Sequence, residues 1–487
     1  MRIPSLLHTG VPRRIFATGF FGTCLLTLGG VGSGVAPAIH DTMAQTLHLT
    51  WVRDHAFTRT LSTALVAIGL VLLAMAWWQL RPLLDRLAPH ALLVVAGVWA
   101  LPLLIAPPLF SGDLYAYLGQ GNLVVNHIDP YSVGPGGFEP ASKWSVNVDP
   151  VWRFAPAPYG PFWLWISASV VRLSQGHLVA AILGIRLVAV IGLLMVGWAL
   201  PRLARMHGVA PQRALWLGLA NPLLLIHGVG GGHNDTLMVG LLAVGLVAAG
   251  RNPSWRRLVV ATLLVVAAAL IKLPAIAALG FLPMALPTWR QRLRAAAVIA
   301  PTAAAGAVLV TLATGLGWGW LDNLDAGSAR LSIFSPVTGL GVGLGKLLQD
   351  IGLVATPLVV TRLVLAGGVA LAGGIALLLL LRSPRLGPQR ALGLTLVAVV
   401  ALAPTVQPWY LVWGLVLLAA TIGPRAELAL GALSVALCLS ILPNGRSLFR
   451  PPMYGAPVIA AVALAVIEVR RSARKVRHEE PREPVPV

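Results

Sequence analysis

The chain has 487 residues, of which 57% are hydrophobic and 11% are charged, and its mean hydropathy is +0.82. A soluble chain of this length needs more charge to cover its surface, so the composition excludes a soluble globular protein. The net charge of +20 is gathered in short arginine clusters between apolar blocks, which argues against a nucleic-acid-binding stripe and indicates cytoplasmic loops.

Apolar blocks long enough to cross a bilayer recur along the chain. The first, residues 15–39, follows Arg13 and Arg14 and ends in Ala36-Pro37-Ala38, which has the form of a signal-peptide cleavage site. Because this block is longer than the apolar region of a usual signal peptide, we expect an uncleaved first helix. Further blocks lie at 60–80, 90–110, 178–200, 214–232, 236–250, 295–313, 357–381, 391–404, 409–423, 428–443 and 456–468.

The stretch 258–287 is apolar but is interrupted by Lys272 and Pro274, and arginine clusters flank it on both sides. Both of its ends should therefore be cytoplasmic by the positive-inside rule. This predicts an even number of crossings, made by a pair of short, broken helices with Lys272 near the outer turn.

The same charge rule orients the whole chain. Both termini are expected inside, and the segment 111–154, which is rich in acidic residues, is expected outside. The other outer segments would be 233–235, 315–335 and 404–408, which requires 156–171 and 336–348 to be re-entrant or juxtamembrane.

We therefore expect an all-α polytopic membrane protein of about 14 transmembrane helices. An extracytoplasmic loop at about 111–155 would carry juxtamembrane helices. The membrane domain would cover 1–470, and the tail 471–487, which has no apolar periodicity, would be cytoplasmic and disordered.

Polar residues at membrane depth are costly, and here they collect in the segments expected outside. Asp113 directly follows the third apolar block. A carboxylate at the lip of a helix can be partly desolvated, which raises its pKa and suits a general base. A solvated helix cap is the simpler alternative, since Ser111 and Asp113 belong to types that often terminate helices.

Carboxylates and aromatic rings also alternate in these segments. Asp129-Pro130 by itself indicates a turn, but a ring such as Tyr131 beside a carboxylate can also hold a sugar. Tyr159, with the pair Trp409-Tyr410 after Gln407, gives further rings near headgroup level. An interfacial aromatic belt explains these rings equally well.

The run from His227 to Asp235 is rich in glycine. It lacks the Lys-Ser/Thr ending of a nucleotide-binding loop, but it allows close backbone approach to a bulky ligand. No metal site is expected, because His227 and His233 are six residues apart and Cys24 and Cys438 lie far apart in apolar segments.

Four isolated cations, Arg186, Lys272, Arg330 and Arg362, lie away from the arginine clusters. Such residues either snorkel to an interface or stabilise a departing phosphate. Lys272 and Arg330 are the better candidates for phosphate, whereas Arg186 and Arg362 are structural or functional.

Taken together, these segments resemble the polyprenol-phosphate-mannose-dependent α-(1→6)-mannosyltransferases, GT-C-type membrane enzymes that build lipomannan in actinobacteria. The matching motifs occur in order along the chain: Gly112-Asp113-Leu114-Tyr115-Ala116-Tyr117, Gln120-Gly121, Asp129-Pro130-Tyr131, Pro158-Tyr159-Gly160-Pro161, Asn221-Pro222-Leu223, Gly231-Gly232-His233-Asn234-Asp235, Lys272-Leu273-Pro274 and Pro408-Trp409-Tyr410. Gln407 stands where many relatives have His, so its role carries over less directly.

The resemblance implies a GT-C-type bundle in the plasma membrane with an extracytoplasmic active site. It implies mannose transfer from a polyprenyl-phosphate donor to a lipid-linked glycan by inverting displacement, with Asp113 as the catalytic base. No cofactor is expected, and the sequence leaves the metal dependence open. Nucleic acid is not expected as a partner. The residues that would bind substrate are Tyr115, Tyr117, Asp129, Tyr131, Tyr159, His233, Asn234, Asp235, Lys272, Arg330, Gln407, Trp409 and Tyr410.

The main alternative is a multi-pass transporter or lipid flippase, because helices broken by Gly and Pro with charges at depth are typical of that class. Against it, the sequence shows no internal repeat, and its polar groups gather outside instead of at the midplane. A non-catalytic membrane partner in an assembly is a further alternative.

Overall fold

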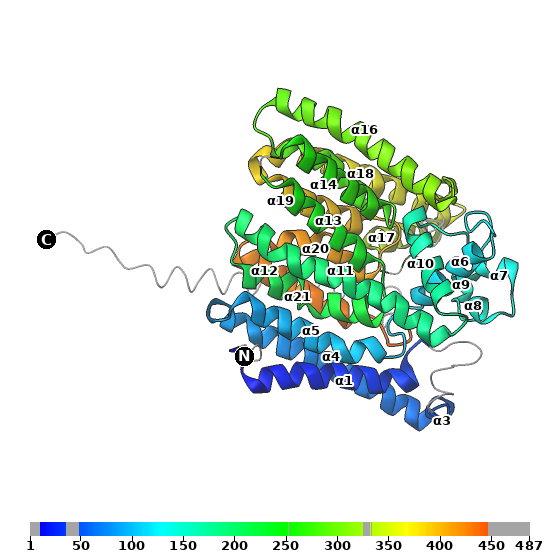
Figure 1. Ribbon diagram of the computed structural model, residues 1–487. Helices are drawn as coiled ribbons and strands as arrows, with labels where there is room; N and C mark the ends of the chain where they lie inside the picture. Colours follow the sequence, from blue (N-terminus) through cyan, green and yellow to red (C-terminus); the bar gives the residue numbers. More distant parts are fainter. Residues whose placement is uncertain (1–9, 36–47, 252, 325–331, 333, 447–487) are drawn as a thin grey trace.

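The computed structural model describes residues 10–35, 48–251, 253–324, 332 and 334–446 (Figure 1). Four predicted features lie outside these ranges: the tripeptide 36–38, Arg330, the apolar block 456–468 and the tail 471–487. Every regular element within the described ranges is a helix, which confirms the all-α prediction.

The longer helices mostly follow the predicted apolar blocks, although the one at 336–350 lies where a re-entrant or juxtamembrane segment was expected. They are α1 (Arg13–Ser33), α4 (Ala56–Leu80), α5 (Pro89–Ile105), α11 (Leu178–Met206), α13 (Asp235–Ala249), α14 (Trp255–Ala269), α16 (Trp289–Thr314), α17 (Pro336–Asp350), α18 (Pro357–Leu386), α19 (Pro388–Leu402) and α21 (Pro424–Cys438).

Shorter helices connect them. They are α3 (Trp51–Asp54), η1 (Arg81–Arg86), α6 (Asp113–Val125), α7 (Pro135–Phe138), α8 (Lys143–Val146), α9 (Pro150–Arg153), α10 (Pro161–Leu173), α12 (Pro211–Gly218), η2 (Leu224–Gly230), η3 (Leu273–Ala277), α15 (Ala278–Phe281), η4 (Pro283–Ala285), η5 (Gly319–Leu321), η6 (Pro408–Leu411) and α20 (Val412–Ala419). The expected loop at 111–155 therefore does carry short helices.

Five helices in the described ranges are long and apolar enough to cross a bilayer, or six if η2 and α13 together make one span. Shorter apolar helices such as α5, α19 and α20 accompany them. The protein is therefore an integral membrane protein, while the expectation of about 14 crossings stays a prediction.

The predicted block 214–232 does not form one helix. α12 ends at Gly218, and the chain resumes as a π-helix, η2, at Leu224. Between them, Pro222 lacks a backbone N–H, and the Asn221 carbonyl oxygen Oδ1 accepts from the N–H of Leu223 at 2.9 Å. Hydropathy measures apolar length and does not detect such a local break.

η2 and α13 meet at an angle of 115°. The chain turns through Gly231 and Gly232, and Gly232 has a φ of +65°, a conformation that residues with a Cβ rarely adopt. The bend places His233 and Asn234 at its corner, directly before the first turn of α13. The chain also breaks where expected near Lys272, since α14 ends at Ala269 and η3 begins at Leu273.

Loops with basic residues meet at one end of the helices. Arg213 at the start of α12 pairs with Asp85 of η1 at 3.0 Å and with Glu427 of α21 at 3.2 Å. Arg81 pairs with the same Glu427 at 3.3 Å. These contacts bring three loops, all expected inside, to the same end of the bundle, which we call the basic end.

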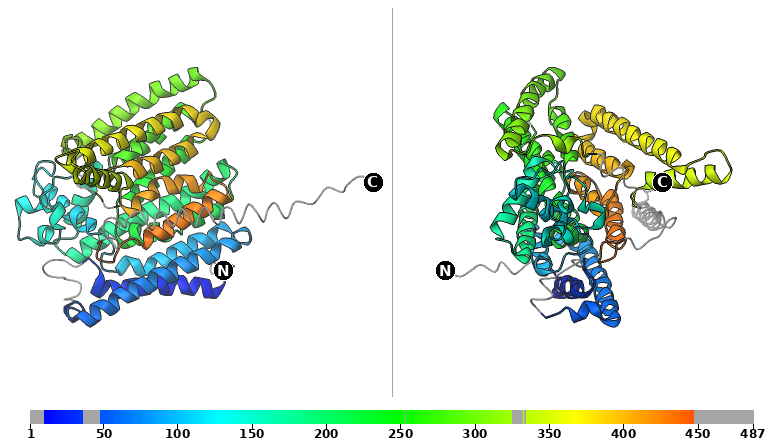
Figure 2. Two further views of the ribbon diagram at one scale, coloured as in Figure 1. Left: turned by 180° about the vertical axis from the view of Figure 1, so that it is seen from behind. Right: turned by 90° about the vertical axis from the view of Figure 1, so that its right-hand side faces the viewer.

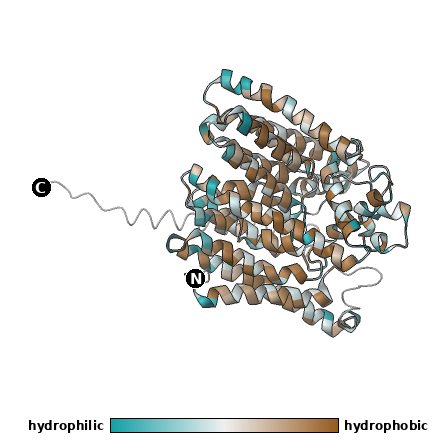
Figure 3. Cartoon of the chain, in the orientation of Figure 1, coloured by the Kyte–Doolittle hydropathy of each residue, from teal (hydrophilic) through white to brown (hydrophobic). Residues whose placement is uncertain are grey.

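A cavity of about 450 Å³ joins more loops at the basic end, since Met206, Arg251, Pro287 and Gln389 all line it. Figure 3 shows hydrophilic residues gathered at this end, on the left of the view. The α6–α10 segment projects from the opposite end of the bundle, as Figure 1 and the left view of Figure 2 show. The two kinds of loop that the charge rule separated therefore lie at opposite ends of the helices.

Close packing between helices depends on small residues at the crossings. A Cβ built on Gly192 of α11 would lie 2.5 Å from the backbone N of Leu237, and one on Gly240 of α13 would lie 2.7 Å from the carbonyl O of Gly192. α11 and α13 thus approach to backbone contact, which positions the bend at the start of α13 against the bundle.

Candidate active site

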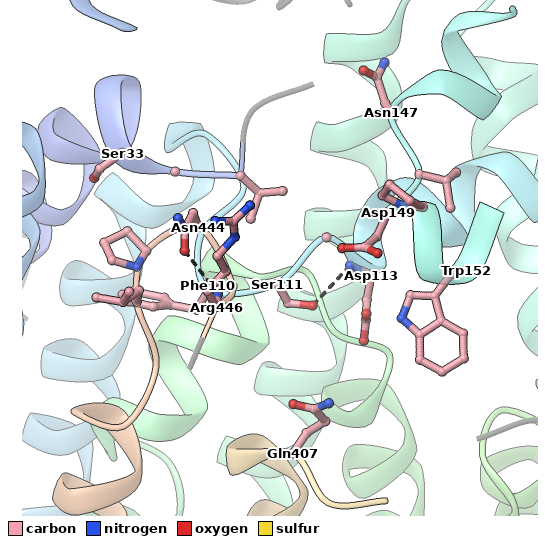
Figure 4. A pocket seen from close by; sticks show the side chains of 18 of the residues that line it. Ser33, Phe110, Ser111, Asp113, Asn147, Asp149, Trp152, Gln407, Asn444 and Arg446 are labelled. Carbon is pink, nitrogen blue, oxygen red and sulfur yellow. Dashed lines mark hydrogen bonds between the residues drawn. The ribbon is translucent and has the colours of Figure 1, made fainter. Parts of the chain in front are cut away.

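Asp113 is the first residue of α6, and its carboxylate faces a cavity (Figure 4). Gly112 occupies the N-cap position, and no side chain caps the start of this helix. The backbone N–H of Asp113 donates to Ser111 Oγ at 3.1 Å. The carboxylate itself is therefore not used as a helix cap, and its role as a base stays a prediction.

The cavity has a volume of about 560 Å³ and is formed by segments far apart in the sequence. In Figure 4, Asp149 and Trp152 lie beside Asp113, Asn444 and Arg446 face them, and Gln407 closes another side. The wall also includes residues 32–35, Arg59, Thr63, Phe110, Trp409 and Leu442. This size suits a small ligand or part of a larger one. We call it the polar cavity.

The surroundings of Asp113 raise the pKa of its carboxyl group above the usual value for aspartate. Burial raises its pKa to about 6, although the positive charge of Lys272 and the Ser111 hydrogen bond lower it, while the negative charges of Asp235 and Asp149 raise it. The side chain still keeps 23% of its surface exposed. A carboxylate with this pKa is ionised at neutral pH and is a stronger base than an ordinary aspartate.

The ring of His233 lies close to the carboxylate of Asp113. Its Nδ1 is 3.5 Å from Asp113 Oδ2, and its ring stacks on Trp409 with centroids 4.0 Å apart. The His233 side chain is buried, whereas Trp409 lines the polar cavity. The bend between η2 and α13 therefore supplies a buried ring that lies close to both Asp113 and Trp409.

Asp235 and Lys272 form a buried ion pair next to this group. Lys272 Nζ donates to Asp235 Oδ1 at 2.8 Å and lies over the ring of Tyr410, 4.3 Å from its centroid. Trp413 Nε1 donates to the same carboxylate oxygen. Lys272 does not line the polar cavity, so its positive charge acts on the cavity from a distance.

Several buried polar atoms around the bend have no hydrogen-bond partner among the described residues. They are both ring nitrogens of His227 and of His233, Asn234 Nδ2, Asp235 Oδ2 and Trp409 Nε1. Such orphaned atoms are uncommon in proteins and each is costly, so their concentration in one place points to a polar ligand or to water. In the same ranges, no group of three or more His, Cys, Asp or Glu could hold a metal ion.

The tyrosines of α6 pack into the same region. Tyr117 is fully buried, and its hydroxyl donates to Asn234 Oδ1 at 3.4 Å. Tyr159 packs edge-on against Tyr117, with ring centroids 5.3 Å apart. Burial and then the negative charge of Asp113 raise the pKa of Tyr159. Tyr115 is buried in α6 and does not line the polar cavity.

Asp129 and Tyr131 lie apart from this group. They follow the C-terminal end of α6, whereas Asp113 begins it, and neither lines the polar cavity. Asp129 Oδ1 accepts from the backbone N–H of Tyr131 at 2.9 Å, which is the geometry of a turn. Tyr131 packs against Gly319 of η5. The structure gives both residues a local structural role, and substrate contact by them stays a prediction.

Arg186 and Arg362 have different surroundings. Arg186 is buried in α11 and donates to the carbonyl oxygens of Leu104 at 2.9 Å, of Gly230 at 2.8 Å and of Ala106. These oxygens lie at the C-terminal ends of α5 and η2, where backbone carbonyl groups have no N–H donor within the helix. Arg186 therefore has a structural role, whereas Arg362 is exposed on α18.

Most residues that line the polar cavity were not predicted from the sequence, among them Arg59, Asp149, Trp152 and Arg446. Arg446 is a lone cation after an apolar block at the end opposite the arginine clusters, and this pattern could have indicated it. Trp413, which binds Asp235, is indistinguishable in the sequence from other aromatic residues of an apolar helix.

Comparison with known proteins gives consistent matches. Residues 16–288 match the family model of the alpha-(1→6)-mannopyranosyltransferase N-terminal domain, and residues 335–471 match that of the MptB C-terminal domain. A probable alpha-(1→6)-mannopyranosyltransferase of Mycolicibacterium smegmatis is 36% identical over 448 residues, which cover 84% of this chain and 79% of the relative.

Two further relatives are similarly close. An alpha-(1→6)-mannopyranosyltransferase of Mycobacterium tuberculosis is 34% identical, over 82% of this chain and 77% of its own length. Alpha-(1→6)-mannopyranosyltransferase B of Corynebacterium glutamicum is 30% identical, over 88% of this chain and 77% of its own length. No solved structure matches the chain.

Proposed function

The chain belongs to the alpha-(1→6)-mannopyranosyltransferase family, and we propose that it transfers mannose from a polyprenyl-phosphate donor to a hydroxyl of a lipid-linked, mannan-type glycan. The names of its relatives support an α-(1→6) linkage. The transferase domain would cover 1–470, with a catalytic loop at about 111–155 and a cytoplasmic tail at 471–487.

One observation carries the proposal: the carboxylate of Asp113 faces a polar cavity and has a pKa of about 6. The acceptor 6-hydroxyl would donate its proton to Asp113 as its oxygen bonds to C1 of mannose. The bond between C1 and the phosphate oxygen breaks on the opposite face, and polyprenyl phosphate leaves. Because this displacement inverts C1, an α product requires a β-linked donor.

The leaving group needs no proton, because a phosphate carries its developing negative charge far better than an alkoxide does. Positive charge near that phosphate stabilises the transition state. Arg59 and Arg446 are exposed on the wall of the polar cavity and are the cations best placed for this. Lys272 would act more weakly, because Asp235 already pairs with it.

The donor sugar would lie near the bend between η2 and α13. His233, Asn234 and Asp235 bring orphaned polar atoms there, and Trp409 stacks on His233. Sugar hydroxyls satisfy polar atoms of this kind, while sugar C–H faces pack on aromatic rings. The aromatic residues Tyr117, Tyr159 and Tyr410 do not line the polar cavity and would support these side chains from the protein side.

We place the reaction on the extracytoplasmic side of the plasma membrane. The arginine clusters gather at the basic end of the bundle, and the positive-inside rule assigns that end to the cytoplasm. The α6–α10 segment lies at the opposite end (Figure 1), and several of its residues line the polar cavity. A lipid-linked donor held in the outer leaflet reaches this site without leaving the bilayer.

The substitution Asp113→Asn tests the base role, because it keeps the size of the side chain and removes its ability to accept a proton. Transfer of radiolabelled mannose from polyprenyl-phosphate-mannose in membranes should fall by about 10²–10⁴-fold, the usual contribution of a general base. Glu139→Gln is the matched control, since Glu139 is an exposed acid in the same loop that does not line the cavity.

Near-normal transfer by Asp113→Asn would exclude Asp113 as the base. Transport of the lipid across vesicles, without formation of a mannosylated product by the unmodified protein, would instead support the flippase alternative. The broken helices η2 and η3 are the feature that keeps this alternative open.

A further inference from the structure

A second, apolar cavity adjoins the polar one. Its volume is about 140 Å³, and its walls come from α19, η6, α21 and the start of α17. Val397 and Val400 of α19 face Leu433, Ala436 and Leu437 of α21 across it. We call it the apolar groove.

Gln407 lines both the polar cavity and the apolar groove. It is the N-cap residue of η6, and it lies where the two spaces meet. A ligand that passes Gln407 therefore has one part among charged groups and the other part among hydrocarbon side chains.

Among the residues that the structure describes, only Gln407 offers a free polar group to a ligand in the groove. Ser440 lines it, but the Ser440 hydroxyl donates to the carbonyl oxygen of Leu437 at 2.7 Å. The remaining lining residues are valine, leucine, alanine, proline and phenylalanine. Only an apolar chain gains free energy by entering such a space.

We infer that the apolar groove binds the first part of the donor's prenyl chain, while its phosphate and sugar occupy the polar cavity across Gln407. This inference rests on the proposed function. The groove is much smaller than the roughly 300–1,000 Å³ of a cavity that encloses a whole small ligand. It therefore holds only the start of the chain, and the rest lies in the bilayer.

Photolabelling tests this inference without requiring turnover. A prenyl phosphate with a diazirine on its first isoprene unit should label residues 433–440 of the full-length protein. Asp113→Asn should be labelled equally, because it changes the base and leaves the groove intact. Labelling of that variant is thus informative even if the proposed function fails, and failed labelling alongside normal transfer would overturn only the groove.

Ala436→Trp fills the groove and provides the kinetic arm. Its KM for long-chain polyprenyl-phosphate-mannose should rise at least about tenfold, because buried methylenes no longer contribute to binding, while kcat changes little. Leu377→Trp is the control, since Leu377 is 56% exposed on α18 and lies outside the groove. The milder Ala436→Leu should give a smaller rise in KM and guards against misfolding of the Trp variant.

Three results would overturn the inference. The first is labelling confined to other helices, and the second is an unchanged KM in a folded Ala436→Trp protein. The third is efficient cross-linking of Ala436→Cys to a cysteine placed at Ala460, in a background without Cys24 and Cys438. That result would assign the groove to the chain's own apolar block 456–468.

Discussion

Asp113 is the residue on which the proposed chemistry depends, and its surroundings make a prediction about pH. A base acts only when ionised, and the pKa of Asp113 is about 6. Transfer measured as kcat/KM should therefore rise about tenfold per pH unit below the pKa and level off above it. Asp113→Asn should show no such inflection in its residual rate.

Two neighbours should move this inflection in opposite directions. Ser111→Ala removes a hydrogen bond that lowers the pKa of Asp113, so the profile should shift to higher pH. Asp149→Asn removes a negative charge that raises this pKa, so its profile should shift to lower pH. If both variants have the same pH profile as the unmodified protein, the inflection reports the ionisation of a group other than Asp113.

Substitution of Arg186 should lower the stability of the protein, because this side chain binds three buried carbonyl oxygens. Arg186→Met leaves the carbonyl oxygens of Leu104, Ala106 and Gly230 without this donor, and each buried group left unsatisfied costs about 1–3 kcal/mol. The melting temperature in detergent should fall clearly, whereas Arg362→Met on the exposed face of α18 should leave it nearly unchanged. Equal melting of the two variants would contradict the structural role of Arg186.

At the level of single residues, the sequence located part of the candidate site. Asp113, Gln407 and Trp409 were all expected there, and all three line the polar cavity. The pairing of Lys272 with Asp235 was not foreseen, because it joins residues 37 positions apart across a fold that hydropathy does not describe. Asp129 was grouped with Asp113 by sequence proximity, but the length of α6 separates them.

At the level of helices, the crossing of α11 and α13 predicts a strong dependence on glycine. Gly192→Leu should lower the melting temperature or abolish folding, because even its Cβ would meet the backbone of α13 at 2.5 Å. Gly97→Leu is the matched control, since a Cβ on Gly97 of α5 meets no atom within 4 Å. Size-exclusion profiles and melting curves in detergent compare them directly.

Most long helices could be predicted from apolar length, since α1, α4, α11, α16 and α18 all overlap predicted blocks. The break between α12 and η2 could not be predicted from apolar length, because it depends on Pro222 and on a side-chain hydrogen bond inside an apolar run. The break at Lys272 could be predicted because a charge and a proline coincide there. A charged residue or a proline inside an apolar block indicates a local break in a helix. The length of the block indicates only that a helix could span the bilayer.

At the level of the whole molecule, the proposed orientation can be tested by labelling. In a background without Cys24 and Cys438, a cysteine replacing Glu139 should react with an impermeant maleimide on intact cells. A cysteine replacing Arg251 should react only after permeabilisation, because Arg251 lies at the basic end. Reaction of both cysteines from one side would end the proposed topology.

Gln407 lies where the two spaces meet, so the proposed binding mode would give each product a separate exit. In the proposed binding mode, the spent carrier slides sideways along its hydrocarbon tail into the leaflet. The lengthened sugar chain withdraws through the polar opening instead. Because the two products would leave by different routes, neither would block the release of the other. Successive rounds of elongation would then need no wide opening of the helix bundle.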